Sequence, residues 1–360
     1  MTASWRDRTL EELLAEHGLA GVPEEPFPTD GWSGARFSYL RSIDGAGFVL
    51  KRGSPAHDWL ARALLDTQFR EAEFVDRAVR QHLPFLSVMF GPLVLPYLGA
   101  AVDGDESVIL MPDLSTDLLA WERPGHSRAI DPSVIERVIE VIARLHTLAW
   151  WTASGDEPEL PWCPLRERIT LLTPASAERY RAEGNPVGEI FLAGWEAFDR
   201  HASTEARALI GRLTADPDPL IDALARLPVV GLHGDLKLSN VAVSDDGRVG
   251  IIDWQMVMKG PVAVELGWLL VSNVAVLPHE PELVLADYFD AVRRATPGDD
   301  DIVGDRSTTT DLALIVGLLL RGWRKGLDAE AGATLASGVA ATEDLSWWCA
   351  RAADAAARHL

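Results

Sequence analysis

The chain has 360 residues, of which 48% are hydrophobic and 24% are charged, a composition typical of a globular protein with a buried core. Its 33 basic and 54 acidic residues give a formal net charge of −21, which disfavours nucleic acid and anionic membranes as partners. Only two cysteines are present, Cys163 and Cys349, and the apolar run 312–320 is shorter than the roughly 20 residues of a membrane-spanning helix. Residues 1–8 contain no apolar signal core, so we expect a soluble, cytoplasmic protein without a disulfide framework.

The amino-terminal part of the chain is predicted to be rich in β-structure. Two strand-like segments, 35–41 and 48–51, flank a glycine-bearing turn, a pattern typical of a β-hairpin. Over residues 59–80 the apolar spacing lengthens to that of a helix. A further strand pair is expected, with its last strand at 107–111. Pro112-Asp113 ends it, and we place the boundary between two lobes there.

The remainder of the chain is predicted to be mostly helical. Residues 131–133 (Asp-Pro-Ser) are typical of a helix start and precede the apolar pattern 134–151. Further helices are expected over 186–226, 262–275, 281–295, 308–326 and 337–357. A short β segment interrupts them at 240–253. The predicted fold class is α+β, with a small β-rich lobe (1–112) and a larger helical lobe (113–360).

The β segment and its approach contain the residues most informative about chemistry. An apolar strand leads into His233-Gly234-Asp235, and Asn240 follows five residues after the aspartate. A hairpin can then return the chain through a second apolar strand and bring Asp253 beside Asn240. One amide and one carboxylate oxygen, with positions left for water and phosphate, suit Mg²⁺. A third oxygen group, Asp235, can accept a proton from an attacking hydroxyl.

An Asp-x-x-x-x-Asn sequence followed by a later aspartate is the arrangement of kinase active sites. With glycine in the middle of the His-Gly-Asp triplet at 233–235, the chain resembles the aminoglycoside phosphotransferase and choline kinase-like superfamily, small-molecule relatives of the protein kinases. Segments 145–150, 70–74 and 111–115 also resemble parts of that family. The resemblance extends over residues 33–270 and is strongest in the catalytic loop.

The resemblance implies a bilobal protein-kinase-like fold and a role for each matching residue. Asp235 resembles the catalytic base that receives the proton of the substrate hydroxyl. Asn240 and Asp253 resemble the Mg²⁺ ligands. Lys237, two residues after the base, is expected to reach the γ-phosphoryl group during transfer, where its charge offsets the charge that develops.

The same resemblance implies a nucleotide site in the amino-terminal lobe. Lys51, at a strand end, resembles the lysine that holds the α- and β-phosphates of ATP. Glu71 on the next helix resembles its carboxylate partner, with Glu73 as the alternative. Met111 and Asp113 lie where the family has the hinge that contacts adenine.

Several positions depart from the family pattern. No Gly-x-Gly-x-x-Gly sequence is present, and Ser33 with its neighbouring glycines is the expected phosphate-covering loop. Trp254 and Gln255 follow the metal aspartate where protein kinases have Phe-Gly, which favours the small-molecule branch. Glu265 stands where the family has an aspartate that supports the catalytic loop, while His146 on an apolar helix face is interpreted as a core histidine.

These residues predict a kinase that uses ATP and Mg²⁺ to phosphorylate a hydroxyl of a small molecule directly, without a phosphoenzyme. An aminoglycoside, an amino sugar or a similar cationic alcohol suits the acidic chain. A neutral sugar or a nucleoside-type antibiotic is the second possibility for the acceptor, and a nucleotide-binding pseudokinase with a regulatory role is the third. The same catalytic loop serves antibiotic resistance and primary metabolism, and the sequence is compatible with a monomer or a homodimer.

Overall fold

The computed structural model describes residues 4–27, 33–80, 93–119, 130–148, 159–273, 277, 281–296, 302–335 and 337–360. Its contacts divide the chain into two compact units. The first unit comprises Met1–Leu119, Gly155–Cys163 and Ser239–Val257, and the second comprises Ala120–Ser154, Pro164–Leu238 and Met258–Leu360. Ser239–Val257 therefore groups with the amino-terminal residues, although it follows residue 112, where the sequence analysis placed the lobe boundary.

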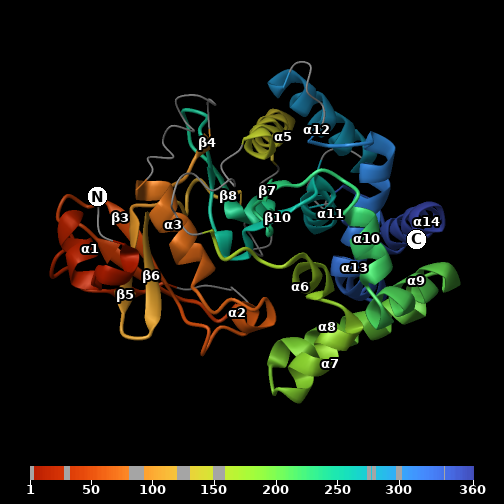
Figure 1. Ribbon diagram of the computed structural model, residues 1–360, viewed down its shortest axis with the longest axis horizontal. Helices are drawn as coiled ribbons and strands as arrows, with labels where there is room; N and C mark the ends of the chain where they lie inside the picture. Colours follow the sequence, from red (N-terminus) through yellow and green to blue (C-terminus); the bar gives the residue numbers. More distant parts are fainter. Residues whose placement is uncertain are drawn as a thin grey trace. The chain divides into compact units, whose positions relative to one another are not determined.

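The first unit is built on a five-stranded antiparallel sheet of strand order β1-β2-β3-β6-β5 (Figure 1). Its strands are β1 (Glu25–Pro26), β2 (Arg36–Arg41), β3 (Gly47–Gly53), β5 (Gly99–Asp103) and β6 (Glu106–Pro112). The predicted hairpin is confirmed, because β2 pairs with β3 and Gly45 in the turn has a φ of 90°, which glycine adopts at little cost. Leu40, Leu50 and Leu110 are fully buried on the sheet and form the core with α1 (Leu10–Glu16).

The helical pattern over 59–80 forms two helices rather than one, α2 (Trp59–Ala63) and α3 (Arg70–Arg80). Leu65 and Phe69 between them have φ values of 55° and 56°, and a left-handed residue ends a helix. The Asp66 carboxylate then accepts a hydrogen bond from the Arg70 N–H and starts α3. Apolar spacing could not reveal this interruption, because the periodicity continues across it.

The predicted β segment is confirmed as the hairpin of β8 (Val241–Val243) and β9 (Val249–Ile251). In the first unit β9 also pairs in parallel with β4 (Leu93–Val94), which makes a three-stranded sheet. The apolar strand that precedes the His-Gly-Asp triplet is β7 (Val230–Leu232) in the second unit, where it pairs with β10 (Met258–Gly260).

The second unit is otherwise helical (Figure 1). Its helices are α5 (Pro132–Thr147), α6 (Leu165–Thr170), α7 (Pro174–Ala182), α8 (Pro186–His201), α9 (Thr204–Ala215), α10 (Asp218–Leu224), α11 (Val262–Asn273), α12 (Pro281–Ala295), α13 (Arg306–Glu330) and α14 (Ala341–His359). The central helix is α13, which packs against α8, α11 and α14. A Cβ at Gly267 would collide with the Ala313 carbonyl oxygen, so this glycine permits the close approach of α11 and α13.

The helix predicted over 134–151 starts as expected, with Asp131 as its N-cap, and the structure describes it to Thr147, while residues 149–151 lie outside the described part. The segment 186–226 forms three helices, because Ser203 and Pro217 begin new ones. Within the described ranges, no helix is both long and apolar enough to cross a membrane. The predicted α+β class, with a small sheet-rich part and a larger helical part, is confirmed.

Candidate active site

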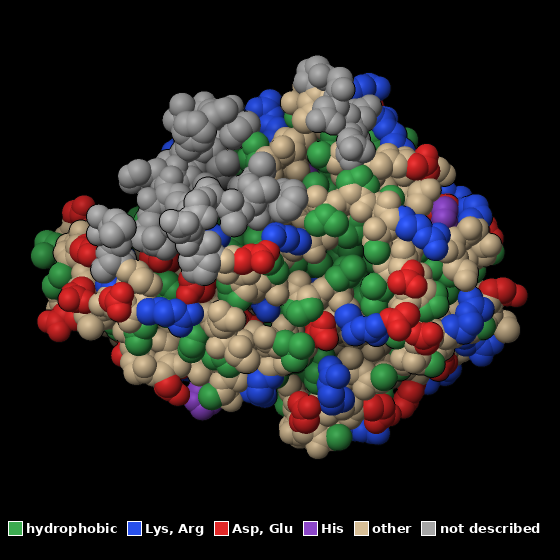
Figure 2. Space-filling model, in the orientation of Figure 1, with side chains coloured by type: hydrophobic (Ala, Val, Ile, Leu, Met, Phe, Trp, Pro, Cys, Tyr) green, Lys and Arg blue, Asp and Glu red, His purple; other side chains and the backbone are tan. Residues whose placement is uncertain are grey.

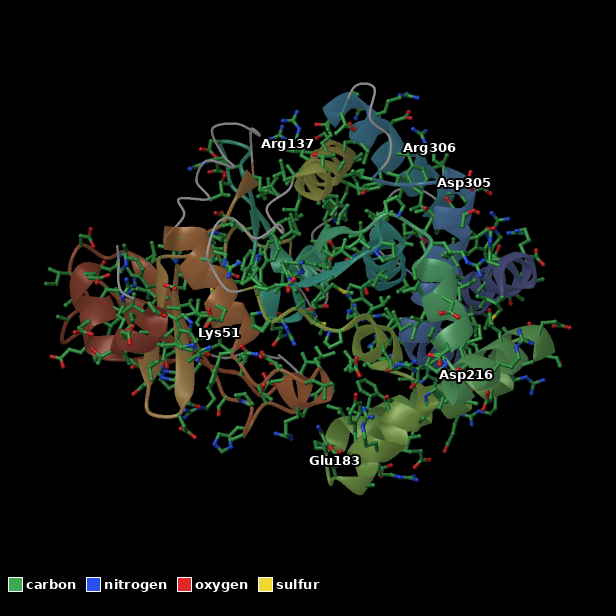
Figure 3. All side chains as sticks on the ribbon, in the orientation of Figure 1. Lys51, Arg137, Glu183, Asp216, Asp305 and Arg306 are labelled. Carbon is green, nitrogen blue, oxygen red and sulfur yellow. The ribbon has the colours of Figure 1, made fainter. Side chains whose placement is uncertain are left out.

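Lys51, labelled in Figure 3, lies on β3. Its ammonium group pairs with two carboxylates of the first unit. Its Nζ is 2.6 Å from Glu71 Oε2 on α3 and 2.5 Å from Asp253 Oδ1, just after β9. Burial lowers the pKa of Lys51, but the charges of Asp253 and Glu71 outweigh it and hold the pKa above its usual value. The ammonium group is therefore a permanent positive charge, as a ligand for phosphate oxygens needs to be.

Glu71, rather than Glu73, is the partner of Lys51. Burial raises the pKa of Glu71 to about 7, with the positive charge of Lys51 acting against it. Its second oxygen, Oε1, accepts a hydrogen bond of 3.2 Å from the Trp254 N–H. Glu73 instead pairs with Arg6 at 2.6 Å. One carboxylate thus ties α3 both to the lysine of β3 and to the residue that follows Asp253.

Asp253 adopts a left-handed backbone conformation with a φ of 71°, which costs a non-glycine residue on the order of 1 kcal/mol. The Tyr97 hydroxyl accepts a hydrogen bond from the Asp253 N–H (2.9 Å), and the Asn240 carbonyl oxygen accepts one from the Ile252 N–H (3.0 Å). The β8–β9 hairpin therefore brings Asn240 and Asp253 to the same end of the two strands, as the sequence indicated.

Two residues of α3 contact the segment after Asp253 in ways that the sequence analysis missed. The Arg70 guanidinium is 1% exposed and donates hydrogen bonds to the carbonyl oxygens of Leu64, Pro161 and Gln255. Phe74 stacks on Trp254 with ring centroids 4.2 Å apart. The sequence showed that Phe74 is apolar and that Arg70 lies in a segment resembling the family. It did not indicate which residues the two side chains contact.

The predicted hinge and phosphate-loop residues lie in the first unit, on β6 and in two segments next to its strands. Met111 on β6 is paired with Val49 of β3 and is 6% exposed. The Asp113 N–H donates to the Gly47 carbonyl oxygen at 2.9 Å, and its carboxylate accepts a hydrogen bond from the Ser115 N–H. Ser33 Oγ accepts a hydrogen bond from the Ala35 N–H. These contacts order the backbone of both segments.

The His-Gly-Asp triplet of the second unit is held by Glu265 on α11. The Glu265 carboxylate accepts hydrogen bonds from the His233 N–H (3.0 Å) and the Gly234 N–H (2.6 Å), so the longer side chain reaches the loop. The Asp235 N–H donates to His233 Nδ1 at 3.2 Å. Asn273, also on α11, accepts a hydrogen bond from the Leu238 N–H at 3.0 Å. The loop backbone is thus fixed along its length by side-chain hydrogen bonds.

His146 on α5 is buried, as predicted, and also extends the network around Glu265. Its Nε2 is 2.8 Å from Glu265 Oε2, and its Nδ1 is 2.7 Å from the Tyr288 hydroxyl on α12. Burial raises the pKa of Glu265, but the hydrogen bond and charge of His146, with those of His233 and the Gly234 N–H, outweigh it. The net result is a pKa below the usual value, so Glu265 stays ionised and acts as a hydrogen-bond acceptor.

Asp235 is 3% exposed, and its Oδ2 is 3.3 Å from Lys237 Nζ. The structure therefore places the two predicted catalytic residues together in the second unit, and Lys51, Glu71, Asn240 and Asp253 together in the first.

The residues expected to hold a metal are one carboxylate and one amide. Among the described ranges, no group of three or more His, Cys, Asp or Glu side chains could hold a metal ion. The expected pair, Asn240 and Asp253, would be a different kind of site, since Mg²⁺ takes few protein oxygens and keeps its remaining positions for water and phosphate. The donor chemistry of this pair fits Mg²⁺.

Comparison with known families identifies the chain. The model of the phosphotransferase enzyme family matches residues 29–299, more than half of the 360 residues. The chain belongs to this family. The match confirms the superfamily that the His-Gly-Asp triplet indicated, and the family's members are phosphotransferases.

Solved structures of small-molecule kinases resemble this phosphotransferase. An amicoumacin kinase, solved with AMP-PNP and Ca²⁺, matches with a TM-score of 0.53 and 11% identity over 92% of this chain and 88% of that one. Choline kinase LicA from Streptococcus pneumoniae matches with a TM-score of 0.47 and 14% identity over 97% of this chain and 98% of that one. An aminoglycoside-3'-phosphotransferase of type VIII has a TM-score of 0.43 and 20% identity over 81% of this chain and 94% of that one. The amicoumacin kinase match supports the kinase-like fold.

Proposed function

We propose that this phosphotransferase transfers the γ-phosphoryl group of ATP directly to a hydroxyl of a small molecule. The observation that carries the proposal is the position of Lys51 between Glu71 and Asp253. A buried lysine held by two carboxylates is a fixed cation for the phosphates of ATP. In this proposal residues 1–112 form the nucleotide-binding lobe and 113–360 the catalytic and substrate-binding lobe.

Each predicted site residue has a defined task in this reaction. Lys51 holds the α- and β-phosphates, and Glu71 keeps its side chain extended towards them. Met111 and Asp113 form the hinge against adenine, while Ser33 belongs to the loop over the phosphates. Asn240 and Asp253 would hold Mg²⁺, which neutralises charge on the phosphate oxygens when bound.

Asp235 accepts the proton of the acceptor hydroxyl as its oxygen attacks the γ-phosphorus and the β–γ bridging bond breaks. Lys237, 3.3 Å from Asp235, donates hydrogen bonds to the transferred group, and ADP leaves with the electron pair of the broken bond. Glu265 fixes the backbone N–H groups of the two residues before Asp235, so the base is oriented before substrate binds.

We further propose a cationic acceptor, such as an aminoglycoside or an amino sugar. The net charge of −21 supports this choice, since an acidic protein attracts cationic alcohols. Figure 2 shows that basic side chains lie among the acidic ones on the face in view, so the attraction comes from the total charge rather than from one visible patch.

The experiment measures ADP release with Mg·ATP over aminoglycosides, amino sugars, neutral sugars, choline-type alcohols and nucleoside antibiotics. We expect one class to be phosphorylated, with a product heavier by one phosphate, and Asp235→Asn to retain ATP binding while losing turnover by orders of magnitude. Turnover with a neutral acceptor alone would contradict the cationic acceptor. ATP binding without ADP release in any reaction would contradict the kinase function and favour a nucleotide-binding regulator.

A further inference from the structure

A buried arginine contacts the triplet that contains Asp235. Arg168 on α6 is 1% exposed, and its Nε donates a hydrogen bond of 2.6 Å to the carbonyl oxygen of Gly234. Its guanidinium also lies over the Trp268 ring of α11, 4.8 Å from the centroid. The arginine therefore connects α6 and α11 with the residue immediately before the proposed base.

The hydrogen bond of Arg168 acts on the peptide that joins Gly234 to Asp235. Gly234 has a φ of 86°, and because glycine has no Cβ to restrict its backbone, hydrogen bonds to its peptide groups are needed to hold this conformation. Arg168 holds the carbonyl oxygen of this peptide, and His233 Nδ1 accepts a hydrogen bond from its N–H. Glu265 holds the two preceding N–H groups, so the orientation of the Gly234–Asp235 peptide depends on Arg168 at its carbonyl oxygen and on His233 at its N–H.

We propose that Arg168 is a positioning residue for phosphoryl transfer. By fixing the Gly234 carbonyl oxygen with a charged donor, it sets the direction in which the Asp235 carboxylate projects. It acts through the backbone and does not touch the reacting atoms. The inference rests on the proposed function, in which Asp235 receives the proton of the acceptor hydroxyl.

The first test compares Arg168→Met with Arg321→Met. Arg321 on α13 lies over the same Trp268 ring at 5.6 Å, so it is a matched control for loss of an arginine from this ring. We expect Arg168→Met to lower kcat about 100-fold, the effect of a misplaced catalytic group, with the KM for ATP unchanged. Arg321→Met should keep the kcat of the unmodified protein. Equal kcat values for the two variants would overturn the proposal.

A double-mutant cycle separates positioning from a general structural effect. If Arg168 acts through Asp235, Arg168→Met should cause no further loss of kcat in the Asp235→Asn background. An additional loss of the same size in that background would overturn the proposal. If Arg168→Met does not fold, Arg168→Lys replaces it in the cycle, because lysine keeps the charge but has no donor at the Nε position.

Hydrogen–deuterium exchange tests the same contact without turnover. We expect the amides of residues 233–235 to exchange faster in Arg168→Met than in Arg321→Met, while α13 keeps its protection. Unchanged exchange at these amides would overturn the proposal. If the unmodified protein phosphorylates none of the acceptors, the proposed function fails, and the exchange result by itself decides whether Arg168 fixes the loop.

Discussion

Lys51 forms ion pairs with two carboxylates of the first unit, those of Glu71 and Asp253. The family resemblance indicated this lysine and its partner Glu71, and it gave Asp253 as a Mg²⁺ ligand. The contact between Asp253 and Lys51 came from the structure. The choice between Glu71 and Glu73 required the structure, since both lie in the first turn of α3 and only their side-chain directions separate them. Tyr97, Arg70 and Arg168 were missed because each acts on the backbone of a residue distant in sequence.

Glu71→Gln tests this pairing, with Glu73→Gln as the control. Removing the Glu71 charge leaves Lys51 held by Asp253 alone, so we expect kcat/KM for ATP to fall by about 10-fold or more. Glu73 pairs with Arg6, whose side chain is 44% exposed, and a solvent-accessible pair of this kind contributes little. Steady-state kinetics with varied ATP would measure kcat/KM for both variants. Equal kcat/KM values would show that Glu71 does not contribute to the ATP site.

A second prediction at this scale concerns stability and pH. Burial raises the pKa of Asp58 to about 6, so the folded state keeps a proton that the unfolded state releases near pH 4. The stability therefore falls as pH rises from about 4 to 6. Asp58→Asn cannot ionise and can still accept the hydrogen bonds from the Leu60 and Ala61 N–H groups, so at pH 8 it should be more stable than the unmodified protein by up to about 3 kcal/mol.

The matched control is Asp305→Asn, at the N-cap of α13. The pKa of Asp305 is lowered by its hydrogen bonds from Thr308, so loss of its charge should give no gain at pH 8. Urea unfolding at pH 4 and pH 8 measures the free energy of unfolding of each variant relative to the unmodified protein. A stability curve of Asp58→Asn parallel to that of the unmodified protein would contradict the prediction.

At the scale of elements, the break between α2 and α3 determines where Arg70 and Glu71 stand. A helix continuous over 59–80 would place these residues on a different face relative to β3, whereas the left-handed Leu65 and Phe69 redirect the chain before α3 begins. The α5 start and the β2–β3 and β8–β9 hairpins were predicted correctly, because their signals are local turn and capping residues. The α2–α3 break offers only Asp66 as such a signal, because its left-handed residues are Leu65 and Phe69 rather than glycine.

Leu65→Gly should stabilise the protein. Leu65 is 60% exposed and has a φ of 55°, so glycine removes the steric cost of the left-handed conformation and loses little packing. We expect a gain of about 0.5–1 kcal/mol after the greater flexibility of unfolded glycine is subtracted. Leu283→Gly, at a 53% exposed position in α12, should instead lose about 1 kcal/mol. Guanidinium unfolding of both variants gives the sign of the change in the free energy of unfolding. Destabilisation by Leu65→Gly would contradict the prediction.

At the scale of the whole molecule, the net charge of −21 acts on charged partners over several ångströms of solvent. Salt screens this attraction, with a Debye length of about 10 Å at 0.1 M and about 3 Å at 1 M. For a cationic acceptor we therefore expect kcat/KM to fall as ionic strength rises from 0.02 to 0.5 M, by about 10-fold. For a neutral acceptor of the same reaction, or for an acetylated form of the cationic acceptor, kcat/KM should change little over the same range of ionic strength. Equal salt dependence for both would exclude steering by the protein charge.

The sequence by itself determined the α+β class and both hairpins, because these depend on local patterns of glycine, capping residues and alternating apolar side chains. The motif around His233-Gly234-Asp235 determined the superfamily, and the resemblance supplied the residues at which chemistry is expected. The tertiary structure decided which acid meets Lys51, how Glu265 reaches the His233-Gly234 backbone, and where Arg168 is anchored. Those contacts join residues 20 to 66 positions apart, and their existence depends on side-chain direction in a packed interior. The spacing of residues along the chain does not specify the direction in which their side chains point.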